Sequence, residues 1–101
     1  MKNGLVEKGD RFLVTSDMPT SGLAVEAAPA SGGFKCTVPA GTVLVADGDQ
    51  REGAPGFYCL PENYKEMEHS LVPEAERQGK YMSYVLLCRS AEIGHLLQAL
   101  N

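Results

Sequence analysis

The chain has 101 residues, 44% hydrophobic and 22% charged, which is typical of a single globular domain spanning residues 1–101 with one core. Thirteen acidic residues against nine basic ones give a net charge of -4, which repels phosphate backbones and argues against nucleic-acid binding. The longest apolar run, Val85–Cys88, is far shorter than the roughly 20 residues that cross a bilayer, so membrane insertion is not expected.

The first periodic segment of the chain covers residues 10–16. Phe12 and Val14 share one face of an extended segment there, so we expect a half-buried strand. Residues 16–22 combine Ser, Asp, Pro, Thr and Gly, which predicts a loop after this strand.

A hairpin is predicted next. Apolar residues alternate with polar or small ones over 23–27 and again over 34–38, and the segment 29–33 between them has the length and glycine content of a hairpin loop. Residues 42–46 are rich in β-branched side chains, which predicts a strand buried on both sides. Residues 47–56 form a polar loop.

The second half contains the predicted helical insert. After a short strand over 56–60, Pro61 suits the first turn of a helix that continues to about Ser70. Pro73 begins a second helical turn, so the insert is expected near 61–77.

The most apolar strand is predicted over Tyr81–Cys88, where both faces carry large apolar side chains. Such a strand is central in a sheet or covered at an interface. After it, Ser90 is a good helix cap, and apolar residues follow at spacings of three and four, which predicts a C-terminal helix near 90–100: Ile93, Leu96, Leu97 and Leu100.

These elements together predict a mainly β fold of about 5–6 strands with short helices. Short strands joined by glycine and proline turns are typical of a small antiparallel barrel or a strongly twisted sheet, and an SH3-like or OB-like barrel is the first expectation.

The cysteines Cys36, Cys59 and Cys88 are odd in number and widely spaced, unlike a disulfide framework. No CxxC or HxxxH pair is present, so we expect reduced thiols that fill the core, and no metal. The segment Met1–Val6 lacks the apolar stretch of a signal peptide, and a cytoplasmic location is therefore expected. The familiar nucleotide-binding and hydrolase motifs are absent, so no cofactor is expected and no catalytic motif is found.

The predicted insert carries the most suggestive polar residues. Glu62, Glu66 and His69 fall on one helix face, where a histidine beside a carboxylate suits a general base; a solvated acidic surface explains the same pattern. Tyrosines suit binding surfaces but equally the edge of a core. The candidate ligand-binding residues are Tyr58, Tyr64, Glu66, His69 and Tyr84.

Two functions from different classes remain open. The first is a noncatalytic interaction module that contacts a protein partner or forms a homodimer through Tyr81–Cys88 or the C-terminal helix. The alternative is a small-molecule-binding protein or modest enzyme with a pocket between the barrel and the insert. A mimic of nucleic acid would need a denser array of acidic residues than the insert provides.

Overall fold

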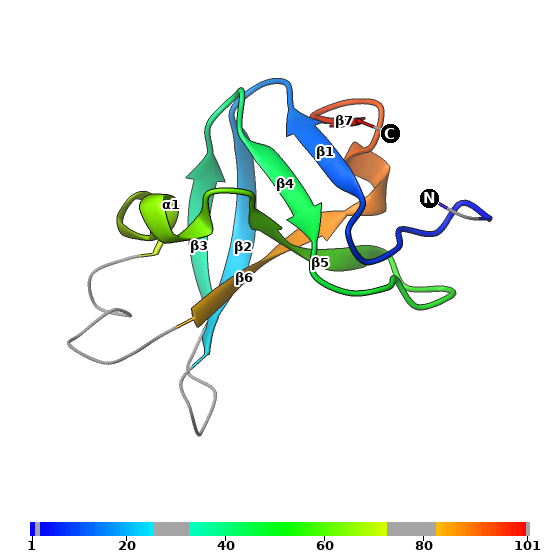
Figure 1. Ribbon diagram of the computed structural model, residues 1–101, viewed down its shortest axis with the longest axis horizontal. Helices are drawn as coiled ribbons and strands as arrows, with labels where there is room; N and C mark the ends of the chain where they lie inside the picture. Colours follow the sequence, from blue (N-terminus) through cyan, green and yellow to red (C-terminus); the bar gives the residue numbers. More distant parts are fainter. Residues whose placement is uncertain (2, 26–32, 73–82, 101) are drawn as a thin grey trace.

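The computed structural model describes residues 1, 3–25, 33–72 and 83–100, and within them one antiparallel sheet of seven strands and one short α-helix (Figure 1). The strand order is β3-β2-β6-β5-β4-β1-β7. This confirms the mainly β prediction. The strands are β1 Arg11–Val14, β2 Met18–Val25, β3 Gly33–Val38, β4 Val43–Ala46, β5 Gly56–Pro61, β6 Ser83–Arg89 and β7 Leu97–Ala99. The helix is α1 Tyr64–Leu71, and the 3-10 turn η1 is Ser90–Glu92.

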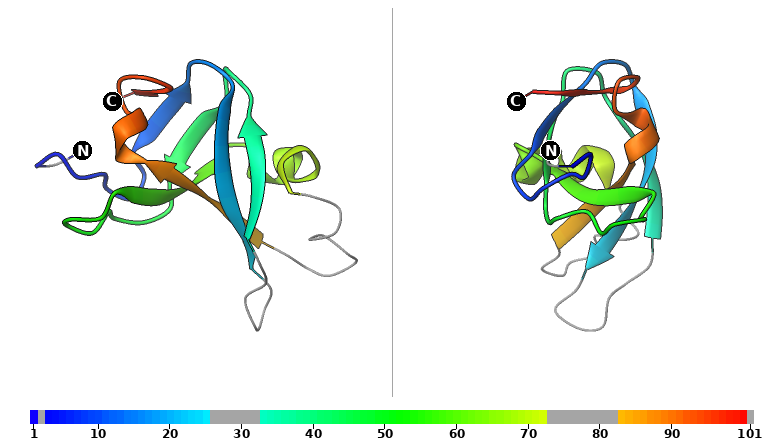
Figure 2. Two further views of the ribbon diagram at one scale, coloured as in Figure 1. Left: turned by 180° about the vertical axis from the view of Figure 1, so that it is seen from behind. Right: turned by 90° about the vertical axis from the view of Figure 1, so that its right-hand side faces the viewer.

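The sheet curls strongly, so that β1 and β4 lie across from β2 and β3 while β5 and β6 cross between the two halves (Figures 1 and 2). Twist of one hand in every strand produces this shape. The sheet is not a closed barrel, because no ladder joins β3 to β7 in the part of the chain described. The SH3-like or OB-like assignment stays a prediction.

The core lies inside the curl and follows the two-residue alternation of the strands. In β6, Tyr84, Leu86 and Cys88 are buried, and in β5 the neighbouring side chains Phe57 and Cys59 are buried with them. Other strands, the segment before β1 and the end of α1 add apolar side chains to the same cluster: Val6, Phe12, Val14, Met18, Phe34, Val38, Leu44, Ala46, Leu71, Val72 and Leu97.

Strand β2 begins within the segment that was expected to be a loop. Met18 pairs with Val38 of β3, so the prediction of a loop over 16–22 is wrong from Met18 onward. Pro19 is tolerated because this end of β2 has a paired neighbour only on the β3 side; its ladder with β6 begins at Ser21. The hairpin of β2 with β3 is confirmed, although residues 26–32 lie outside the described part of the chain.

The C-terminal helix predicted near 90–100 is wrong. The chain makes only the turn η1 and then forms β7, which pairs antiparallel with β1 through Val14 and Leu97. Gly94 has a φ of 93°, which interrupts a right-handed helix at its middle. Pairing with the otherwise open edge of β1 supplies hydrogen bonds that a short isolated helix cannot match.

The helical insert is shorter than expected. Pro61 is the last residue of β5, where it is buried opposite Leu44, and α1 begins three residues later at Tyr64. The second helical turn expected over 73–77 lies outside the described residues. Strand β6 is central, as predicted, because it pairs with both β2 and β5; Tyr81 and Met82 lie outside the described residues.

A buried tyrosine ties α1 to the sheet. The hydroxyl of Tyr84 in β6 donates a hydrogen bond of 2.6 Å to the backbone carbonyl of Tyr64 at the start of α1. Leu71 at the other end of the helix is buried in the core. The helix is therefore fixed at both of its ends.

Gly22 of β2 provides a test of the packing inside the curl. A Cβ at this position would lie 2.4 Å from the Phe34 ring and 2.8 Å from the carbonyl oxygen of Val85. Because the backbone oxygen cannot move aside freely, we expect Gly22→Ala to lower the free energy of unfolding by about 1–3 kcal/mol, measured by urea denaturation. Gly48→Ala, whose Cβ meets nothing within 4 Å, is the matched control and should change it by less than about 0.5 kcal/mol. Equal effects of the two substitutions would contradict this packing.

Tyr84 gives a pH-dependent test of the link to α1. Burial, with a smaller contribution from the charge of Glu68, raises the pKa of Tyr84 above its ordinary value of 10.0. Because the pKa of Tyr84 is higher in the folded chain than in the unfolded chain, its contribution to stability is fully present at pH values below the unfolded pKa. This contribution is lost as the pH rises through the folded pKa.

At neutral pH, Tyr84→Phe should lower the free energy of unfolding by about 1 kcal/mol, because the hydrogen bond from the Tyr84 hydroxyl to the Tyr64 carbonyl is lost. Between about pH 9 and pH 11, wild type should lose stability more steeply than the variant in urea denaturation, so the gap between them should narrow. Parallel curves over this range would show that Tyr84 ionises as it does in the unfolded chain.

Candidate functional site

The structure places four of the five candidate residues predicted from the sequence near α1 and the fifth on another strand. Tyr64, Glu66 and His69 lie on α1 with exposed side chains, and Tyr84 lies beneath the helix in the core. Tyr58 lies elsewhere, on the outer side of β5. The structure therefore brings four of the five to the region of α1, where Tyr84 acts as a structural anchor.

A depression lies between α1 and the sheet, as the pocket hypothesis requires, with a volume of about 510 Å³. Its polar side chains are Thr42, Glu62 and Asn63, and Met67 is its contribution from the helix itself. Glu66, His69 and the tyrosines do not line it. Nor does any group of three or more His, Cys, Asp or Glu residues suited to a metal ion occur within the described ranges.

An apolar stripe crosses the outer face of three adjacent strands, β2, β6 and β5. The register sets Leu23 of β2 opposite Val85 of β6, and Leu87 of β6 opposite Tyr58 of β5. The side chains of Leu23, Leu87 and Tyr58 are 39%, 43% and 47% exposed, and Val85 is half-buried. We call these four residues the outer stripe. Contiguous apolar surface of this kind marks contact sites on proteins.

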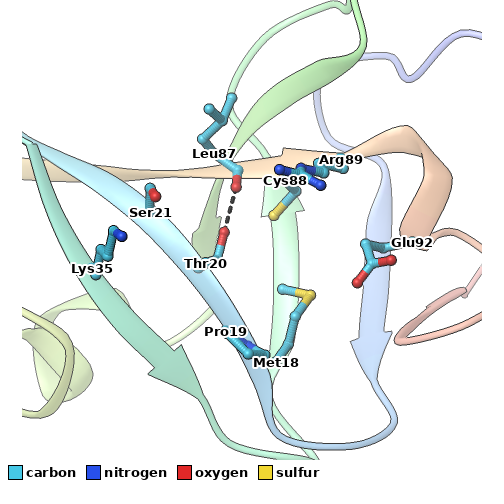
Figure 3. A pocket seen from close by; sticks show the side chains of 9 residues that line it. All are labelled: Met18, Pro19, Thr20, Ser21, Lys35, Leu87, Cys88, Arg89 and Glu92. Carbon is cyan, nitrogen blue, oxygen red and sulfur yellow. Dashed lines mark hydrogen bonds between the residues drawn. The ribbon is translucent and has the colours of Figure 1, made fainter.

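A cleft of about 390 Å³ adjoins the outer stripe where β2 and β6 part (Figure 3). The ladder between these strands ends at Ser21 and Leu87. Beyond this pair β2 continues beside β3 and β6 continues beside β5, so the two strands diverge. The hydroxyl of Thr20 donates a hydrogen bond to the Leu87 carbonyl at the point of divergence. The cleft therefore lies where β2 and β6 diverge, and the hydrogen bond from Thr20 closes it at one end.

The rim of the cleft carries charged side chains. Lys35 of β3 and Arg89 of β6 flank it, and Glu92 of η1 also lines it (Figure 3). Among the residues that the structure describes, neither Lys35 nor Arg89 has a carboxylate within ion-pair distance, whereas Arg11 is paired with Glu62 at 2.9 Å. Two cations without carboxylate partners thus lie beside exposed apolar side chains in a chain of net charge -4.

The arrangement offers groups that can bind carboxylates and apolar side chains. Lys35 and Arg89 can each bind a carboxylate, Arg89 with two parallel hydrogen bonds, and the outer stripe can bury apolar side chains next to them. The floor of the cleft is formed by Met18 and Cys88, which belong to the core.

Part of this surface lies in a segment that the sequence singles out. Both faces of Tyr81–Cys88 are apolar, which predicted a strand that is central or covered at an interface, and the segment includes Val85 and Leu87. Lys35 and Arg89 carried no signal, because they are far apart in the sequence and only the register of β3, β2 and β6 brings them to one cleft.

Residues near the cleft are held by a buried glutamine. Gln50 accepts a hydrogen bond from the backbone N–H of Val6 and donates to the Ala54 carbonyl and to Ser90 of η1. This network fixes η1, and with it the backbone that carries Glu92, against the loop after β4.

No family model, curated protein or solved structure matches this chain. In the part of the chain described, no helix has the length and apolar character that crossing a membrane requires.

Proposed function

We propose that the chain is a noncatalytic interaction module that binds an acidic, partly apolar segment of a partner protein across the outer stripe and the cleft. The observation that carries this proposal is the outer face of β6, where Leu87 is 43% exposed in the middle of a central strand. A central strand is normally covered or polar on its second face, so exposed leucine there favours a contact surface. The proposed location is the cytoplasm, because the three cysteines of the protein are free thiols and disulfides are rare in that compartment.

The charges beside the outer stripe favour an acidic partner. Lys35 and Arg89 attract carboxylates, and a partner that supplies them gains charge-assisted hydrogen bonds at the edge of its apolar contact. A face-to-face homodimer would have to supply these carboxylates from the same surface, and Glu92 is the only acidic residue among those that line the cleft. We therefore favour a different protein over a second copy as the partner.

The size of the site indicates a transient complex. Three exposed apolar side chains and two cations are fewer than the residues that a standard interface buries on each side. Binding energy should concentrate on the side chains at the centre of the contact, which are Leu87 and Tyr58.

The experiment is a selection of displayed random peptides on the immobilised, folded protein, followed by anisotropy titration of the enriched sequences. We expect a consensus that combines Asp or Glu with Leu, Ile, Val or an aromatic residue. Leu87→Ser and Arg89→Glu should each weaken the selected peptides by about tenfold or more, because each removes roughly 1.4 kcal/mol or more of binding energy. Binding should also weaken as salt is added, since the cations are exposed.

Two control substitutions of the same kinds, placed away from the site, show whether a loss of affinity is specific to the outer stripe and the cleft. Leu100→Ser removes an exposed leucine outside the outer stripe, and Arg51→Glu reverses an exposed charge away from the cleft; neither should change the affinity. Failure to enrich any sequence, or equal binding of the selected peptides to Leu87→Ser and Arg89→Glu, would refute the proposal. A wild-type dimer in sedimentation velocity that Leu87→Ser dissociates would replace the acidic partner with a second copy.

A further inference from the structure

Two thiols face each other in the core beneath the cleft. The sulfur atoms of Cys59 in β5 and Cys88 in β6 are 2.6 Å apart, and both residues are fully buried. The chain has one more cysteine, Cys36 of β3, which is half-buried on the inner side of its strand. Core packing alone accounts for buried cysteines but does not require two of them to meet.

The sheet register explains why these two sulfur atoms meet. Cys88 pairs with Phe57 and Cys59 pairs with Leu86, so the two cysteines are diagonal neighbours whose side chains both point into the curl. Short side chains on diagonal neighbours do not ordinarily meet, and here the strong twist of the sheet brings the two sulfur atoms to 2.6 Å. Their sulfur atoms need to approach by only about half an ångström to reach the bond length of a disulfide, about 2.05 Å.

The surroundings distinguish the two thiols. The hydrogen bond with Cys88, together with burial, raises the pKa of the Cys59 thiol, so Cys59 keeps its proton. Cys88 also forms part of the floor of the cleft between β2 and β6, and Figure 3 shows its sulfur on the side of Met18. A small oxidant that enters the cleft therefore meets Cys88 before Cys59.

We propose that Cys59 and Cys88 form a redox-active dithiol that hydrogen peroxide converts to an intrachain disulfide. The Cys88 sulfur, as a thiolate, attacks one peroxide oxygen, the O–O bond breaks, and the hydroxide that leaves takes up the proton that Cys88 has released, which gives a sulfenic acid and one water. The Cys59 sulfur then attacks the Cys88 sulfur, the S–O bond breaks, and the hydroxide that leaves takes up the Cys59 proton as a second water. Two thiols are oxidised by two electrons in total, and one peroxide is reduced to two waters.

The disulfide would join strands that the hydrogen-bond ladder already aligns. It would close the 29-residue separation between the two cysteines and restrict the unfolded chain, so the oxidised protein should melt at a higher temperature than the reduced one. Cys36 would stay a thiol, because burial raises its pKa to about 11 and its sulfur has no hydrogen bond to either cysteine in the described structure. This inference does not depend on the proposed partner.

The test is a thiol count by mass spectrometry on the full chain. Reduced wild type, alkylated with iodoacetamide in denaturant, should carry the label on all three cysteines. After peroxide treatment of the folded protein, only Cys36 should be labelled, the intact mass should fall by about 2 Da before alkylation, and peptide mapping should recover a Cys59–Cys88 linked pair. Dithiothreitol should restore all three thiols.

The variants assign the pair. Cys36→Ala should form the disulfide as wild type does, whereas Cys59→Ser and Cys88→Ser should not. Oxidation in concentrated guanidinium chloride should lose the preference for Cys59 and Cys88, because only the fold brings these sulfur atoms together. Three labelled cysteines after peroxide, sulfinic acid in place of the disulfide, or a linkage that includes Cys36 would overturn the proposal; these outcomes are read on wild type and do not require the variants to fold.

Discussion

Strand β6 is hydrogen-bonded on both sides over only part of its length, and the rest of the structure depends on this constraint. It pairs with β2 up to Leu87 and with β5 as far as Arg89. Its inward side chains join the two halves of the curled sheet into one core. Its outward side chains Leu87 and Arg89 are exposed to solvent, and the place where β2 leaves it becomes the cleft. Strand β6 thus contributes residues to the core, to the outer stripe and to the cleft.

The same strand links the proposed binding surface to the dithiol. Leu87 and Arg89 point outward, and Cys88 between them points inward toward Cys59. Alternation along a strand places such neighbours on opposite faces, so chemistry at Cys88 occurs directly behind the proposed contact residues. A disulfide between β5 and β6 would therefore hold the backbone that presents Tyr58 and Leu87 without occupying the surface itself.

The sequence predicted elements whose pattern admits one explanation. The two apolar faces of β6 indicated a strand that is central or covered at an interface, and it is central; the alternation around the glycine-rich segment indicated the hairpin of β2 and β3. It failed where two structures fit one pattern: Ile93, Leu96, Leu97 and Leu100 have helical spacing, yet Gly94 and the open edge of β1 favour β7. The cleft was beyond prediction, because Lys35 and Arg89 meet only through the pairing of three strands.

The proposed binding surface is tested most directly by titrating a selected acidic peptide into ¹⁵N-labelled protein and following the backbone amide resonances residue by residue. The largest shifts should fall on residues of the outer stripe and of the cleft lining, namely Ser21, Leu23, Lys35, Tyr58, Val85, Leu87 and Arg89. Shifts concentrated on α1 around Glu66 and His69, with the amides of β6 unchanged, would contradict this prediction and move the binding site to the helix.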